Sequence, residues 1–263
     1  KQEGKPAKVE DYSRDMSPYQ IHNEVFTGPQ NSGDQVMIYT SPFSESIWLR
    51  GTIPAGSSRF PVKGALPNPW RTFRLELEKS MKSNSIAFIE SETPNHSPEK
   101  ELLQFTSPTL VEIIELCNHE SINLYADALL KASFSTNKHY PSFPESLDKL
   151  AMYWKKKGNE LRGIQAEDGS GLSSQNLVQA TSYSQFLGQL TSMPNFSVFL
   201  HTLPQMGVSG TVKNIPRGKR PVYVKSGTIK GVKTYAGFVK NAEGDWLSFF
   251  VGVDRYTSKE AKI

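Results

Sequence analysis

The chain has 263 residues, of which 37% are hydrophobic and 21% charged, and its formal net charge at pH 7 is +4. This composition is that of an ordinary globular protein with one large domain or two smaller ones, and the slight positive excess favours anionic partners only weakly. No run of about 20 apolar residues is present to span a membrane, and the single cysteine excludes both an internal disulfide framework and a multi-thiolate metal site.

The N-terminal part of the chain carries weak structural signals. Residues 1–30 combine Lys, Glu, Gln, Pro and Ser with little periodicity, which predicts a linker or a loosely ordered segment. Residues 35–40 and 47–53 have the composition of two strands. A helix is predicted over 71–81, and a short strand within 83–90.

A stronger helical pattern begins at Ser107, which is predicted to cap a helix with Pro108 at its first position. The apolar residues that follow have the spacing of one helical face: Leu110, Ile113, Ile114 and Cys117. The pattern breaks at 118–121 and then resumes, so that Ser121 and Asn123 lie at a junction between two helices. Ser and Asn at such a break can also be simple caps.

Further helices are predicted over 143–158, with Ser146 as the cap, and over 177–190, with a glycine-rich turn at 167–173 between them. Residues 201–220 have the composition of a loop.

The chain ends in a pattern typical of antiparallel strands. Over Val222–Val239 the residues Val222 and Val224 alternate with Tyr223 and Lys225, and a further strand-like stretch covers Trp246–Val253.

The segment Lys225-Ser226-Gly227-Thr228 is the candidate site on the first of these strands. It combines one ammonium group, two hydroxyls and a glycine that allows close approach to the backbone, which suits a carboxylate ligand. The alternative is a solvated strand edge with no ligand.

Two short motifs occur together in one order, Ser121-Ile122-Asn123 and then Lys225-Ser226-Gly227. They correspond to the second and third motifs of penicillin-recognising serine acyltransferases. Over most of 104–255 the chain resembles the D-alanyl-D-alanine carboxypeptidase/endopeptidase family, the low-molecular-mass class C penicillin-binding proteins. The stretches that carry the resemblance are Ser107–Asp127, Glu167–Val178, Leu203–Asn214 and Val224–Val239.

The resemblance implies an α+β fold, in which an antiparallel sheet is flanked by helices as in penicillin-binding proteins and β-lactamases. Residues 104–263 would be the C-terminal part of the catalytic domain, with the sheet incomplete. Residues 31–103 would be the C-terminal part of a mainly β domain that the family inserts between its first and second motifs.

The chain departs from the family in its first motif, the nucleophilic Ser-x-x-Lys, which the family places before the insert. Three such strings occur here, and none of them precedes the insert: Ser97–Lys100, Ser135–Lys138 and Ser146–Lys149. The last has helical spacing, but it is also readable as a helix cap followed by a surface lysine. The family's nucleophile is therefore expected outside this chain, and the fragment alone is expected to be inactive.

The function that the resemblance implies is serine-type D-Ala-D-Ala carboxypeptidase or endopeptidase activity on peptidoglycan stem peptides, through an acyl-enzyme that β-lactams would also form. Ser121 would relay a proton, Asn123 would hold the substrate amide, and Lys225 would supply positive potential. Ser226, Gly227 and Thr228 would bind the substrate carboxylate, with the Thr228 N–H as one oxyanion donor. A periplasmic or cell-envelope location goes with this function.

Other functions are weighed against this one. A non-catalytic peptidoglycan-binding or interaction protein could retain half of the cleft, whereas a class A β-lactamase relative is disfavoured by the insert remnant. The five histidines share no ligand spacing, so neither a metal nor a cofactor is predicted. The basic cluster at 217–220 lacks neighbouring aromatic residues, so no nucleic-acid partner is predicted.

Overall fold

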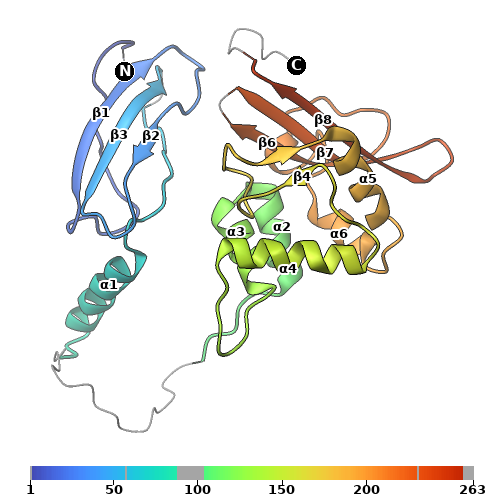
Figure 1. The fold of residues 1–263 in the computed structure, drawn as a ribbon. Coiled ribbons are helices and arrows are strands. Elements are labelled where there is room, and N and C mark those ends of the chain that lie inside the picture. The colour runs from blue at the N-terminus through green and yellow to red at the C-terminus, as the bar shows by residue number, and fades with distance from the viewer. Residues whose placement is uncertain (1, 57, 88–103, 230, 257–263) are drawn as a thin grey trace. The chain divides into compact units, whose positions relative to one another are not determined.

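The computed structural model describes residues 2–56, 58–87, 104–229 and 231–256 (Figure 1). The chain forms two compact units, Lys1–Glu101 and Leu102–Ile263. Within the described residues, no helix has the length and hydropathy needed to cross a membrane.

The first unit is a three-stranded sheet followed by one helix. Strands β1 (Gln20–Gly28), β2 (Met37–Tyr39) and β3 (Ser46–Pro54) lie in the order β1-β3-β2, with β1 parallel and β2 antiparallel to β3. Helix α1 (Pro69–Ser83) begins after Asn68, whose side chain accepts a hydrogen bond from a backbone N–H of the first turn.

Strand β1 corrects the prediction that residues 1–30 are loosely ordered. Its buried positions hold polar Thr27 as well as Val25, and exposed Asn23 lies on the same face, so the apolar alternation that marks a strand is hidden in the sequence. Asn23 donates from Nδ2 to the Ala7 carbonyl, and the Ala7 N–H donates to Val25 O, which ties the preceding segment to β1 as well.

The predicted strands at 35–40 and 47–53 and the predicted helix at 71–81 are present as β2, β3 and α1. The strand predicted within 83–90 is not found at its start, because α1 continues to Ser83 and residues 84–87 are not strand. Its remainder, 88–90, lies outside the described residues.

The second unit combines helices with two antiparallel sheets. Its helices, including one short 3-10 helix, are α2 (Leu110–Glu120), α3 (Asn123–Ala132), α4 (Phe143–Lys156), α5 (Ala180–Leu190), α6 (Phe196–Thr202) and η1 (Gly210–Val212). Its strands are β4 (Ile164–Gln165), β5 (Leu177–Val178), β6 (Val222–Ile229), β7 (Val232–Lys240) and β8 (Trp246–Asp254). The three long strands form one antiparallel sheet in the order β6-β7-β8 (Figure 1).

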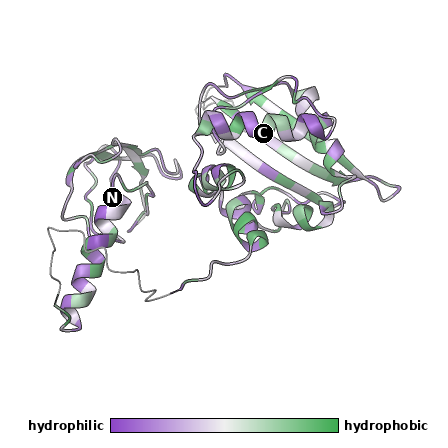
Figure 2. Cartoon of the chain, turned by 60° about the horizontal axis from the view of Figure 1, so that its bottom comes forward, coloured by the Kyte–Doolittle hydropathy of each residue, from purple (hydrophilic) through white to green (hydrophobic). Residues whose placement is uncertain are grey.

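The core of the second unit lies between this sheet and the helices α5 and α6. Phe238 of β7 is fully buried and its ring packs edge-on against Phe196 and Phe199 of α6, with ring centroids 5.0 and 6.4 Å away. Leu187 of α5, Leu200 of α6 and Leu203 just after α6 complete the buried cluster. Hydrophobic and hydrophilic residues are interleaved along the helices in Figure 2, as expected where one helical face covers a core.

Two helix caps differ from the sequence prediction. Thr109, not Ser107, caps α2, and it forms a capping box in which its side chain accepts from the Glu112 N–H while Glu112 accepts from the Thr109 N–H. Ser142, not Ser146, caps α4. In both cases the cap is the Ser or Thr three residues before a Glu, because that spacing lets the Glu side chain or its N–H close the first turn.

The capping box predicts a difference between two neighbouring substitutions. Thr109→Ala is expected to lower the free energy of unfolding by about 1 kcal/mol, because it leaves a first-turn N–H of α2 without its acceptor. Ser107→Ala is the matched control, since the Ser107 hydroxyl donates only to the neighbouring Pro108 carbonyl. Urea denaturation of both variants measures the difference, and a larger loss in Ser107→Ala would restore Ser107 as the cap.

Two further boundaries differ from prediction. The helix predicted over 177–190 starts only at Ala180, because Leu177 and Val178 pair with Gln165 and Ile164 as a short strand. The segment 201–220 predicted as a loop contains the end of α6 and the short helix η1.

Candidate active site

The side chains of Lys225 and Ser121 meet although they are 104 residues apart in sequence. Lys225 Nζ donates a hydrogen bond of 2.7 Å to Ser121 Oγ, and it also donates to the Ser226 carbonyl at 2.8 Å. On β6, Lys225 is paired with Ala236 of β7. Two residues earlier on β6, Tyr223 is paired with Phe238. Lys225 therefore leaves the sheet on the face that carries the core residue Phe238.

Ser121 is positioned by a left-handed turn between α2 and α3. Its backbone has φ 54° and ψ 51°, and its N–H donates to the Cys117 carbonyl, which ends α2. A left-handed conformation is uncommon for a residue other than glycine and costs of order 1 kcal/mol or more. Such conformations cluster at functional sites, where the surrounding structure holds them in place.

Partial burial shifts the pKa values of Lys225 and of Cys117, whose charges also act on each other. Burial lowers the pKa of Lys225 below its ordinary value, although the charge of the nearby Cys117 acts in the opposite direction. Burial likewise raises the pKa of the Cys117 thiol, opposed by the charge of Lys225. A partly dehydrated ammonium group interacts more strongly with an incoming anion than a surface lysine does, because less water screens it.

Ser226, Gly227 and Thr228 continue β6 beyond Lys225, and the last two are exposed. A Cβ added at Gly227 would lie 2.7 Å from Thr234 Oγ1 on the paired strand β7, which favours glycine here. The Val224 N–H donates to Pro204 O, away from β7. Because N–H groups alternate between the two edges of a strand, the Thr228 N–H points to this same outer edge.

Asn123 is the first residue of α3 and is exposed. Among the described residues its side chain makes no hydrogen bond. Although Asn123 is only two residues after Ser121, it therefore takes no part in the contact between Ser121 and Lys225. Ser121 and Lys225 are brought together, and Asn123 is not.

The described Ser-x-x-Lys residues have hydrogen-bond and ion-pair partners other than Ser121 and Lys225. Ser146 is fully buried inside α4 and donates to Ser142 O, while Lys149 pairs with Glu145 on the same helix. Ser135 donates to Lys131 O. The string at 97–100 lies outside the described residues.

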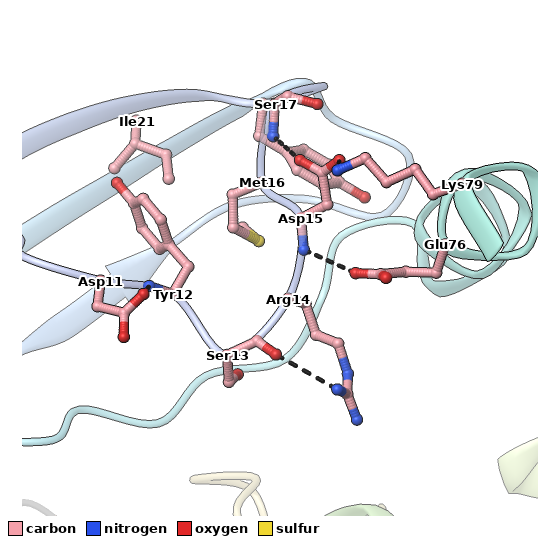
Figure 3. Close-up of a pocket in the computed structure, with 11 residues that line it drawn as sticks. Asp11, Tyr12, Ser13, Arg14, Asp15, Met16, Ser17, Ile21, Glu76 and Lys79 are labelled. Atoms are coloured by element: carbon pink, nitrogen blue, oxygen red, sulfur yellow. Dashed lines mark hydrogen bonds and ion pairs between the residues drawn. The ribbon is translucent and has the colours of Figure 1, made fainter. Parts of the chain in front are cut away.

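A separate hollow of about 660 Å³ lies in the first unit, between residues 11–21 and α1 (Figure 3). Two of its charged side chains, Asp15 and Lys79, form an ion pair, and the Asp15 backbone N–H donates to Glu76 Oε1 at 2.9 Å. The hydrogen bonds from Lys79 and Ser17 lower the pKa of Asp15 to about 2. This hollow contains none of the predicted site residues. In the described ranges, no cluster of three or more His, Cys, Asp or Glu could hold a metal ion.

Comparison with protein-family models decides the family. The model of the D-Ala-D-Ala carboxypeptidase 3 (S13) family matches residues 1–263. The chain belongs to this family. The resemblance read from the sequence motifs is therefore confirmed.

Two curated relatives of this S13-family chain are D-alanyl-D-alanine carboxypeptidases. The protein from Actinomadura sp. is 26% identical over 262 residues, which are 95% of this chain and 48% of the relative. The protein DacB from Haemophilus influenzae is 25% identical over 243 residues, which are 84% of this chain and 51% of the relative. The chain thus spans about half the length of the curated relatives it matches.

The crystal structure of penicillin binding protein 4 (dacB) from Haemophilus influenzae has the same fold. It superimposes with a TM-score of 0.74 at 22% identity and covers 100% of this chain and 60% of the other. A second structure of that protein, in complex with a β-lactam, gives the same TM-score and covers 62% of that chain. The α+β fold of the penicillin-binding type is thereby confirmed.

Sequence reasoning missed one residue at this site of the S13-family chain, Thr211 of η1. Its hydroxyl lies 2.8 Å from that of Ser226. The only sequence signal was the segment Ser209-Gly210-Thr211 in the stretch Leu203–Asn214, which carried the family resemblance but was assigned to a loop.

Proposed function

We propose that this chain forms part of a serine-type D-Ala-D-Ala carboxypeptidase or endopeptidase that acts on peptidoglycan stem peptides. The observation that carries the proposal is the 2.7 Å hydrogen bond from Lys225 Nζ to Ser121 Oγ. It joins a half-buried cation on a strand to a hydroxyl on a constrained turn, which is an arrangement suited to passing a proton to a leaving group beside a bound anion.

The substrate would bind through its terminal carboxylate. Lys225 would supply the positive charge, and the hydroxyls of Ser226 and Thr228 would donate hydrogen bonds, with Gly227 keeping the strand open to the ligand. The Thr228 N–H at the outer edge of β6 would be one oxyanion donor.

The reaction would proceed through an acyl-enzyme on a serine of a Ser-x-x-Lys motif outside residues 1–263. That serine would attack the carbonyl between the two D-alanines, and Ser121 would pass a proton to the departing amine of the last D-alanine. Asn123, exposed at the start of α3, would hold the substrate amide. A β-lactam would acylate the same serine, and the protein would work in the periplasm or cell envelope.

A second candidate is a non-catalytic peptidoglycan-binding protein with the same carboxylate site. It is favoured by the hydrogen bonds of the described Ser-x-x-Lys serines, Ser135 and Ser146, which donate to backbone carbonyls on their own segments and not to Lys225 or Ser121.

Labelling with a fluorescent penicillin distinguishes the two candidates. The polypeptide encoded together with any residues upstream of Lys1 is expected to contain a Ser-x-x-Lys there and to take up the label covalently. If the polypeptide contains that motif and takes up no label, the proposed hydrolase activity is refuted. Absence of the motif together with binding of a D-Ala-D-Ala peptide would establish the non-catalytic alternative.

A further inference from the structure

We propose that Thr211 is a positioning residue of the carboxylate site, which acts by orienting the hydroxyl of Ser226 toward the ligand. This inference rests on the proposed function, because it concerns the recognition of the same terminal carboxylate. The observation that carries it is the 2.8 Å hydrogen bond between Thr211 Oγ1 and Ser226 Oγ.

The two hydroxyls of Thr211 and Ser226 carry two protons, and the hydrogen bond between them needs only one. When Thr211 donates, the proton of Ser226 is left to donate to an anion, and Ser226 then donates more strongly because it also accepts. A serine without this partner could turn its proton toward other acceptors.

The backbone around Thr211 is held firmly enough to perform this role. Val212, the next residue, is fully buried, and its carbonyl accepts from the Gly207 N–H at 3.1 Å. Gly210, the preceding residue, has φ +56°, and a Cβ there would lie 2.9 Å from the Pro204 side chain. Thr211 itself is exposed, so its hydroxyl faces a place that a ligand can reach.

The short helix η1 also touches both walls of the site. It contacts β6, which carries Ser226, and α2, which ends at Ser121. A Cβ at Gly210 would lie 3.0 Å from the carbonyl oxygen of His119, two residues before Ser121. The same turn that places the Thr211 hydroxyl therefore packs against the segment that places the Ser121 hydroxyl.

The test is a titration of the 263-residue chain with diacetyl-L-Lys-D-Ala-D-Ala and with its C-terminal amide, followed by NMR. Wild type is expected to prefer the free acid. Thr211→Val, which keeps the shape of the side chain, is expected to lose roughly 2- to 10-fold in affinity for the acid and nothing for the amide. Thr211→Ser is expected to restore the acid affinity.

A double-mutant cycle shows whether Thr211 acts through Ser226. In a Ser226→Ala background, Thr211→Val is expected to have no further effect on the acid affinity. Equal affinity of wild type and Thr211→Val for the acid would overturn the inference and leave the proposed function standing. No preference of wild type for the acid over the amide would overturn both.

Discussion

Replacing Lys225 by methionine is expected to weaken binding of diacetyl-L-Lys-D-Ala-D-Ala to the 263-residue chain by roughly 10- to 100-fold. A hydrogen bond to a charged group contributes about 1.5–3 kcal/mol, and each 1.4 kcal/mol is about tenfold in affinity. In wild type Lys225 is half-buried and its ammonium group contacts Ser121 Oγ. In Lys225→Met a bound carboxylate would lack this partly dehydrated cation.

Lys219→Met is the matched control for this substitution. It removes the same unit of charge from the exposed loop that precedes β6, so any general electrostatic attraction falls equally in both variants. Isothermal titration calorimetry at one ionic strength measures the two affinities. Equal affinities of the two variants for the peptide would remove Lys225 from its proposed role.

The Lys225→Met substitution is also expected to change the pH dependence of the free energy of unfolding. Because burial lowers the pKa of Lys225 below 10.5, the unfolded chain binds this proton more tightly than the folded chain does. The free energy of unfolding of wild type should therefore rise relative to that of Lys225→Met as the pH increases from the lowered pKa to 10.5. Below that window wild type keeps a charged, partly buried Lys225, whose burial is unfavourable. Lys225→Met should therefore be at least as stable as wild type there, although the charge is needed for the proposed function.

Replacing Gly237 by alanine is expected to be the most damaging of the small substitutions in the sheet. Gly237 lies on β7 opposite Val224 of β6, and a Cβ there would lie 2.0 Å from the carbonyl oxygen of Tyr223 and 2.8 Å from Val224 Cα. Both neighbours are backbone atoms that cannot rotate away. Overpacking of this kind costs about 1–3 kcal/mol or more, and here it would displace the strand that carries Lys225.

Gly218→Ala is the control for this effect. Its added Cβ would meet nothing closer than the Arg220 carbonyl at 4.0 Å, so the free energy of unfolding should change by no more than about 0.5 kcal/mol. Urea denaturation measures both variants, and peptide titration of Gly237→Ala should show weakened binding as well. A Gly237→Ala variant as stable as wild type would show that β6 and β7 can separate without loss.

Much of the second unit was predictable because its patterns are local. The alternation of Val222 and Val224 with Tyr223 and Lys225 marks β6, and the spacing from Leu110 to Cys117 marks α2. The cap of α2 was misassigned because Ser107 was preferred to Thr109, although Thr109-x-x-Glu112 has the spacing of a capping box. The first unit was harder to predict, because β1 buries the polar Thr27 and exposes Phe26, which hides its apolar alternation.

By itself, the sequence determined the family, the order of the two short motifs, and the strands and helices that carry them, because each depends on residues close together in the chain. Only the tertiary structure decided that Lys225 reaches Ser121, that Asn123 does not join them, and that Thr211 does touch Ser226. Those outcomes depend on how β6 is placed against the turn after α2 and against η1. That placement is set by packing between segments far apart in sequence, which no local pattern records.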